Sequence, residues 1–191
     1  MAEVCPLFYL PHKPYEKGKL NMRNLLKPLV LLSCVLSSTF AMANSGKAIV
    51  NHFYADTAAS NNQTDGLLYI TNVAAEAVTV KVTIYDENGK VVSDLDNSAA
   101  GGIIKATNAS NFSDSSSYSA KFNLAANATS RVWLDAKVYP GITGYAVIEW
   151  EKQAGSQSVL SNALISHALM YRVYGSNVGY YSVQVNNGNP F

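Results

Sequence analysis

Residues 78–85, with the sequence VTVKVTIY, decide the fold class of this chain. Every second residue from Val78 to Ile84 is a β-branched apolar residue, and the residues between them are polar. A period of two places one face in a core and the other toward solvent, which is the pattern of a half-buried β-strand. Residues 86–90, DENGK, follow, and Asn-Gly is a strong signal for a hairpin turn. The sequence therefore predicts that Val91 and Val92 begin the return strand.

Other apolar and alternating runs of strand length occur along the chain, with turn residues between them. A short helix is a possible reading of residues 161–169, but the β-branched and aromatic residues that follow favour a strand. The absence of a long run with helical period predicts an all-β fold, an antiparallel sandwich or barrel. The further expected strands are residues 48–54, 67–71, 120–124, 131–135, 144–151, 164–174 and 180–185.

The central strands carry a family resemblance. Residues 70–73, ITNV, followed by the strand at 78–85 and by GKVV at 89–92, resemble the opening of small bacterial extracellular immunoglobulin-like modules. Residues 82–86, VTIYD, are similar to the F-x-L-Y-D strand after which one such module is named, with Val82 where that family has Phe.

Two later segments extend the resemblance. Residues 122–124 and 131–134 look like the mid-domain hairpin of the same group, so the likeness covers residues 66–92 and, more loosely, 120–152. It implies one antiparallel immunoglobulin-like β-sandwich of about seven to eight strands. It also implies a non-catalytic module of a surface or periplasmic protein.

The first 43 residues have the pattern of a leader. Residues 22–27, MRNLLK, form a basic start, residues 28–40 are largely apolar, and residues 41–43, AMA, fit a signal peptidase site. We expect residues 1–21 to be a mis-assigned start and residues 22–43 to be a signal peptide that is cleaved after Ala43. A rival interpretation uses Cys34 as the lipid-modified cysteine of a lipobox.

The expected mature chain, residues 44–191, contains nine basic and eleven acidic residues and no cysteine. Its net charge is −2, whereas nucleic-acid-binding proteins usually have an excess of basic residues. The apolar run of the leader is shorter than the roughly 20 residues of a membrane-spanning helix. We therefore expect a secreted or periplasmic β-domain that is stable without disulfides, with no membrane span in the mature chain.

Residues 94–117 interrupt the spacing of the strands. They are rich in Asp, Asn, Gly and Ser, and few apolar residues break their polarity. We expect one long polar loop, which is either a mobile connection between two halves of the sandwich or a binding loop.

A catalytic constellation is missing from the sequence. The mature chain has only His52 and His167, and no G-x-S-x-G motif or phosphate-binding loop is present. We interpret both histidines as half-buried structural residues, and we expect no catalytic residue and no cofactor. Glu149 and Glu151 form a carboxylate pair on one strand face, which leaves a small secreted hydrolase as an alternative.

Metal ligands are also few. Asp94-Leu95-Asp96-Asn97 offers oxygen ligands of the kind that Ca²⁺ prefers, but the full pattern of a calcium loop is missing. We therefore predict no metal site.

Aromatic residues are the best indication of a binding surface. Tyr180 and Tyr181 are adjacent, so one of them faces outward on a strand whichever faces inward. Exposed aromatic side chains suit contacts with carbohydrate or protein. We name Tyr174, Tyr180, Tyr181 and Phe112 as candidate binding residues for an unknown protein or glycan of the cell envelope.

Two further expectations concern the core and the end of the chain. We expect Trp133 and Trp150 to be buried in the same core, with Glu149 and Glu151 facing solvent. A terminal Phe after alternating residues is also typical of outer-membrane β-barrels, which remains an alternative. The asparagine-rich run before Phe191 favours a turn that returns this side chain to the sheet.

Overall fold

The computed structural model describes residues 44–59, 62–136, 141–156 and 158–191. The predictions about the leader at residues 1–43 lie outside these residues. Within the described part of the chain, no helix is long and apolar enough to cross a membrane.

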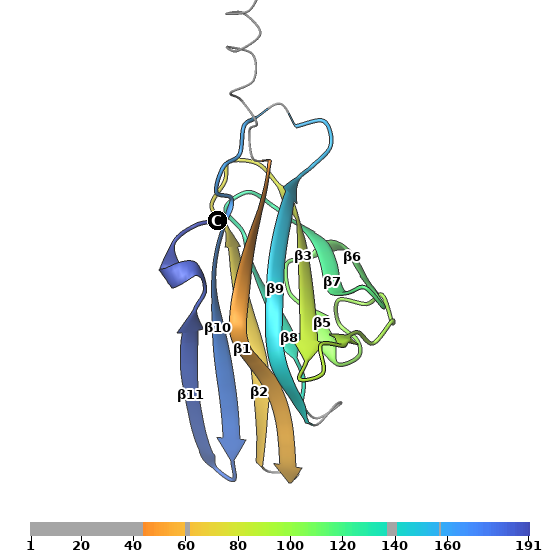
Figure 1. Cartoon of the computed structure of the whole chain (residues 1–191), viewed down its shortest axis with the longest axis vertical. Helices are drawn as coiled ribbons and strands as arrows, with labels where there is room; N and C mark the ends of the chain where they lie inside the picture. Colours follow the sequence, from red (N-terminus) through yellow and green to blue (C-terminus); the bar gives the residue numbers. More distant parts are fainter. Residues whose placement is uncertain (1–43, 60–61, 137–140, 157) are drawn as a thin grey trace, which may run out of the picture. The chain divides into compact units, whose positions relative to one another are not determined.

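Eleven strands and one short 3₁₀ helix are present in the described residues (Figure 1). Their bounds are β1 Ser45–Ala59, β2 Asn62–Asn72, β3 Val78–Asp86, β4 Val91–Val92, β5 Ile104–Ala106, β6 Ser110–Ser115, β7 Tyr118–Leu124, β8 Thr129–Leu134, β9 Ile142–Lys152, β10 Leu164–Tyr174, β11 Asn177–Gln184 and η1 Asn186–Gly188.

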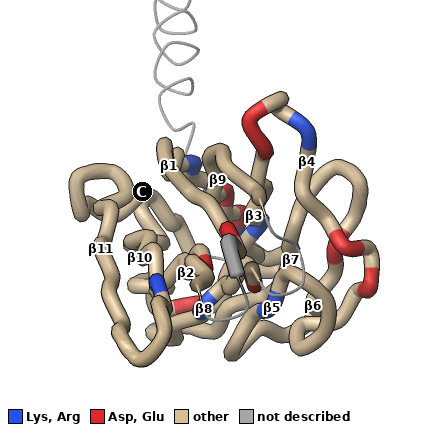
Figure 2. The backbone as a smooth tube through the Cα atoms, turned by 90° about the horizontal axis from the view of Figure 1, so that it is seen from below, with Lys and Arg blue, Asp and Glu red and all other residues tan. Residues whose placement is uncertain are grey.

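The strands form one antiparallel sheet that curls as a half-barrel. Its main path runs β11-β10-β2-β1-β9-β3-β7-β6, while β4 pairs with β3, β8 with β2, and β5 with β8. Figure 2 looks along the strands and shows β11, β10, β2 and β8 on one side of the curl, opposite β9, β3 and β7. The all-β prediction is therefore confirmed.

Strand β1 joins the two sides of the curl. Its first part, up to Ala55, pairs with β9, and its last part, from Asp56, pairs with β2. The register with β9 shifts between Val50 and Phe53. A bulge of this kind bends a strand and increases its twist, which lets one strand serve both sides.

The apolar face of the expected central strand lies in the core. Val78, Val80, Val82 and Ile84 are fully buried, as the alternation predicts. One cluster of buried apolar residues combines side chains from both sides of the curl. The two sides of the curl therefore share one core.

The predicted turn after β3 is also present. Gly89 has a φ of 76°, a left-handed conformation that glycine adopts without steric cost. The carboxylate of Asp86 accepts hydrogen bonds from the backbone N–H groups of Asn88 and Lys90, at 2.9 and 2.8 Å. The strand β4 that follows returns beside β3, as expected.

Two expectations about the fold need correction. The structure has eleven strands instead of seven or eight. Residues 94–117 are not one long loop, because β5 and β6 lie within them. Despite its polarity, this segment is attached to the rest of the fold at two places. Ile103 and Ile104 are buried in the core, and the buried carboxylate of Asp114 accepts a hydrogen bond from the N–H of Asn97.

Candidate functional site

The outer face of one side of the curl carries a groove over strands β8, β2, β10 and β11. Residues that lie directly opposite each other in an antiparallel pair point to the same face, so the register of these strands orders the groove into cross-strand rows. The rows are His167, Tyr69 and Arg131; then Leu169, Leu67, Trp133 and Lys105; then Tyr180, Tyr171 and Asp65.

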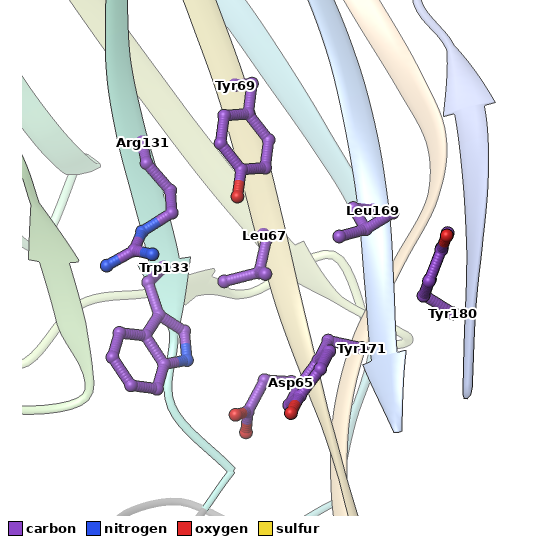
Figure 3. A pocket seen from close by; sticks show the side chains of 8 residues that line it. All are labelled: Asp65, Leu67, Tyr69, Arg131, Trp133, Leu169, Tyr171 and Tyr180. Carbon is purple, nitrogen blue, oxygen red and sulfur yellow. The ribbon is translucent and has the colours of Figure 1, made fainter. Parts of the chain in front are cut away.

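This outer groove is a cavity of about 400 Å³ lined by side chains from all three rows. Figure 3 shows Leu67 in its centre, with Trp133 on the β8 side and Tyr171 and Tyr180 on the opposite side. Leucine and aromatic surfaces thus surround a small number of polar groups. That composition is typical of a ligand-binding cavity, in which apolar surface contributes affinity and a few polar atoms fix the orientation of the ligand.

Trp133 has a different position from the one that the sequence led us to expect. It is half-buried and lines the outer groove, so the prediction that it shares the core with Trp150 is wrong. Its neighbours Val132 and Leu134 are fully buried, and strand alternation therefore turns Trp133 to the opposite face. Trp150 is 2 % exposed, as predicted.

Two cations hold the Trp133 ring in place. The Nζ of Lys105 lies 4.9 Å from the ring centroid, and the guanidinium carbon of Arg131 lies 5.4 Å from it. Both distances are within the range of cation–π attraction. Lys105 is also paired with Asp135 at 2.7 Å, so its charge is compensated.

Two donors in the groove have no hydrogen-bond partner within the described residues. They are the Nε of Arg131 and the indole Nε1 of Trp133, and both atoms are buried. A buried donor that lacks a partner is unfavourable, so such groups are candidates for contact with a ligand or an ordered water molecule.

Asp65 supplies the acidic group of the groove. It is 2 % exposed, and its Oδ1 accepts a hydrogen bond of 3.0 Å from the backbone N–H of Ala136. Gln63 donates to its other oxygen at 3.5 Å. These bonds hold the carboxylate in one orientation at the end of the groove opposite Arg131.

The row that contains Arg131 is fixed by stacking. The rings of Tyr69 and His167 lie 5.0 Å apart and are almost parallel, at 6°. His167 is exposed, so the expectation of a half-buried histidine is wrong for this residue. Its position facing solvent agrees with the predicted alternation of β10, in which Leu164, Ser166 and Ala168 face inward.

The four candidate binding residues do not form one site. Tyr180 lines the outer groove, whereas Tyr181 faces the other side of β11. Tyr174 is exposed at the end of β10 and lines neither of these cavities. Phe112 lies on β6 and packs against the core.

Tyr181 belongs to a small polar cluster with residues of β1. Its hydroxyl lies 2.9 Å from the Nε2 of His52, which is exposed and not half-buried as expected. Partial burial, together with the hydrogen bond to Tyr54, raises the pKa of Tyr181 to about 12. The hydroxyl is therefore neutral at physiological pH and serves as a hydrogen-bonding group.

A cluster of three carboxylates lies apart from the groove. Oxygens of Asp94, Asp96 and Asp114 are within 4.8 Å of one another, which fits the oxygen ligation of a cation such as Ca²⁺. The sequence indicated the first two of these residues but not Asp114. Burial, and the adjacent Asp114 carboxyl, raise the pKa of Asp94 to about 6.

The residues of the hydrolase alternative are engaged in ion pairs. Glu149 lies 2.7 Å from Lys81, and Glu151 lies 3.2 Å from Lys121, on the outer face of β9 and its neighbours. Both glutamates face away from the core, as expected from the inward position of Trp150. A paired carboxylate on an exposed sheet face is ordinary surface chemistry.

Comparison of the chain with protein-family models, with curated proteins and with solved structures found no match.

Sequence reasoning missed most of the outer groove, although the signal for its faces was present. Arg131 and Trp133 alternate with the apolar residues of β8, and Leu67 and Tyr69 alternate with Leu68 and Ile70 of β2. What the alternation could not supply was the pairing of β8 with β2, which brings the two outward faces together.

Proposed function

We propose that this protein is an exported, non-enzymatic binding module that recognises glycans through the outer groove. The observation that supports this proposal is the combination of Trp133, Tyr171 and Tyr180 with polar groups at fixed positions between them. The apolar faces of sugar rings stack on aromatic side chains, while sugar hydroxyls bond to the polar groups around the rings.

The strands beneath the groove favour a glycan over an extended peptide. Strands β8, β2 and β10 each have neighbours on both sides, so their backbone groups are engaged in the sheet. A peptide on this face would gain no backbone ladder, which is the main source of affinity when a strand is added to a sheet edge. Recognition at this face therefore depends on side chains.

A glycan-binding assay tests this function. The purified chain is titrated calorimetrically with a panel of cell-envelope and plant-type oligosaccharides, and Trp133→Ala and Tyr171→Ala are expected to weaken binding about tenfold or more. Tyr174→Ala is the matched control, because this tyrosine is exposed but lies outside the groove. Equal affinity in all three variants, or no binding to any glycan, would contradict the proposal.

We also propose that the fold is an immunoglobulin-like sandwich variant and that the chain is exported with cleavage after Ala43. The support for the first is the shared core of the two sides and the passage of β1 between them. The support for the second is the leader pattern in the sequence. N-terminal sequencing of the exported protein tests the cleavage site, and a lipid-modified Cys34 would refute it.

A further inference from the structure

We propose that the ligand of the outer groove is an acidic oligosaccharide, and that Arg131 binds its carboxylate. This inference rests on the proposed glycan-binding function and adds the chemical class of the sugar.

Arg131 is a cationic residue in the lining of the outer groove. Among the described residues, three lysines are paired with carboxylates, at Glu149, Asp135 and Glu151. Arg131 has no such ion pair within the described part of the chain. A guanidinium in a groove without a carboxylate partner is suited to an anionic ligand group.

The Arg131 guanidinium has a donor that no described residue engages. Its Nε is buried and has no partner, although the side chain is held against the Trp133 ring. Because the Nε is buried, a small rotation of the side chain opens this edge, and a carboxylate can then accept from the Nε and from an adjacent terminal nitrogen at once. Such a bidentate pair is stronger and more directional than a single hydrogen bond.

Trp133 supplies a second donor beside the first. Its Nε1 is buried without a partner, and Figure 3 shows the nitrogen on the side of the indole that faces Leu67 and Asp65. It can donate to a ring oxygen or a hydroxyl of a sugar that lies over Leu67. Stacking and hydrogen bonding then act on the same sugar unit.

The opposite end of the groove is lined by Asp65, Tyr171 and Tyr180. Asp65 is 2 % exposed and accepts from the N–H of Ala136, whereas the tyrosine hydroxyls can exchange hydrogen bonds with sugar hydroxyls. Asp65 and Tyr69 are four residues apart on β2, which corresponds to about 13 Å along a strand. This span exceeds one sugar ring, so the preferred ligand has a carboxylate near Arg131 and a hydroxyl-rich unit near Tyr171.

A pair of matched ligands tests the inference. The purified chain is titrated with an oligogalacturonide and with the same oligosaccharide after reduction of its carboxylates to alcohols. We expect the acidic form to bind at least about tenfold more tightly, and this difference to shrink as NaCl is increased, because salt screens the ion pair.

Variants locate the contact. Arg131→Gln is expected to abolish the preference for the acidic form while the weaker binding of the reduced form remains. Arg172→Gln is the matched control, since Arg172 is exposed on the same side of the curl but lines a different cavity. An unchanged thermal midpoint shows that the variants are folded.

The possible outcomes separate the two proposals. Equal binding of the acidic and reduced forms, both lost in Trp133→Ala, would overturn the acidic class and leave glycan binding standing. A preference that survives in Arg131→Gln would overturn the role of Arg131. If the chain binds neither form of the oligosaccharide but binds poly-glutamate, both the acidic-sugar inference and the glycan-binding function would be overturned.

Discussion

The indole Nε1 of Trp150 donates a hydrogen bond of 2.6 Å to the backbone oxygen of Phe191. Both residues are buried, and Phe191 also exchanges backbone hydrogen bonds with Leu164, at 2.9 and 3.2 Å. The end of the described chain is therefore attached to β9 and to the start of β10. This arrangement agrees with the expectation that Phe191 returns to the sheet.

Phe191→Ala is expected to lower the free energy of unfolding by about 3 kcal/mol, because it removes a buried aromatic side chain and leaves a cavity in the core. Urea unfolding followed by circular dichroism measures this change. Tyr174→Ala is the control, since its side chain is 60 % exposed. A loss no larger than in the control would show that Phe191 does not belong to the core.

Ser119 bridges two strands from inside the core. Its Oγ accepts a hydrogen bond of 2.8 Å from the N–H of Ile84 and donates to the carbonyl of Val92, and the residue is fully buried. Ser119→Ala is expected to cost about 2–3 kcal/mol, since buried backbone groups lose their partner. Ser117→Ala, at an exposed site, should change stability by less than about 0.5 kcal/mol. Equal effects in denaturant unfolding would contradict the bridging role.

The two tryptophans should differ in their access to solvent. The Trp150→Phe variant reports on Trp133 alone, and the Trp133→Phe variant reports on Trp150 alone. Acrylamide is expected to quench the fluorescence of the first variant more strongly, because Trp133 is half-buried in a groove and Trp150 is 2 % exposed. Stern–Volmer constants of the two variants measure this difference. The opposite order would return Trp133 to the core and remove it from the binding surface.

The raised pKa of Asp94 predicts a pH dependence of stability. The carboxyl has a pKa of about 6 in the folded chain against an ordinary value of 3.8, so the folded state binds more protons between these values. The free energy of unfolding should therefore fall as the pH rises from about 4 to about 6. Hydrogen bonds from Asp94 and from the backbone N–H of Asn97 lower the pKa of Asp114. Its own contribution is therefore a rise of stability with pH, which is complete above about pH 5.

Asp94→Asn tests this dependence. The amide oxygen of asparagine can still accept from the N–H groups of Ile103 and Ile104, which bond to the carboxylate at 2.7 and 3.1 Å. The free energy of unfolding is measured with urea between pH 4 and pH 7, with EDTA present so that no divalent cation offsets the carboxylate repulsion. It should fall less with rising pH in the variant than in the unmodified protein. An identical fall in both proteins would contradict the assignment to Asp94.

The sequence by itself determined the all-β class and the faces of several strands. Period-two alternation is a local property, because successive side chains of a strand point to opposite faces whatever the strand pairs with. For this reason the inward faces of β3 and β10 and the burial of Trp150 could be predicted. The turn at Gly89 was predicted separately, from the Asn-Gly pair. The same rule, applied to β8, would have placed Trp133 outward. The prediction instead placed Trp133 in the core because tryptophan is hydrophobic and its neighbours are apolar.

Only the tertiary structure decided which outward faces meet. The outer groove exists because β8 pairs with β2, and β2 with β10, in registers that align Trp133 with Leu67 and Leu169. Likewise, Asp114 reaches Asp94 because β6 folds back within a segment whose composition resembles a loop. Strand pairing between distant segments depends on the packing of the whole core, and local periodicity carries no information about the partner of a strand.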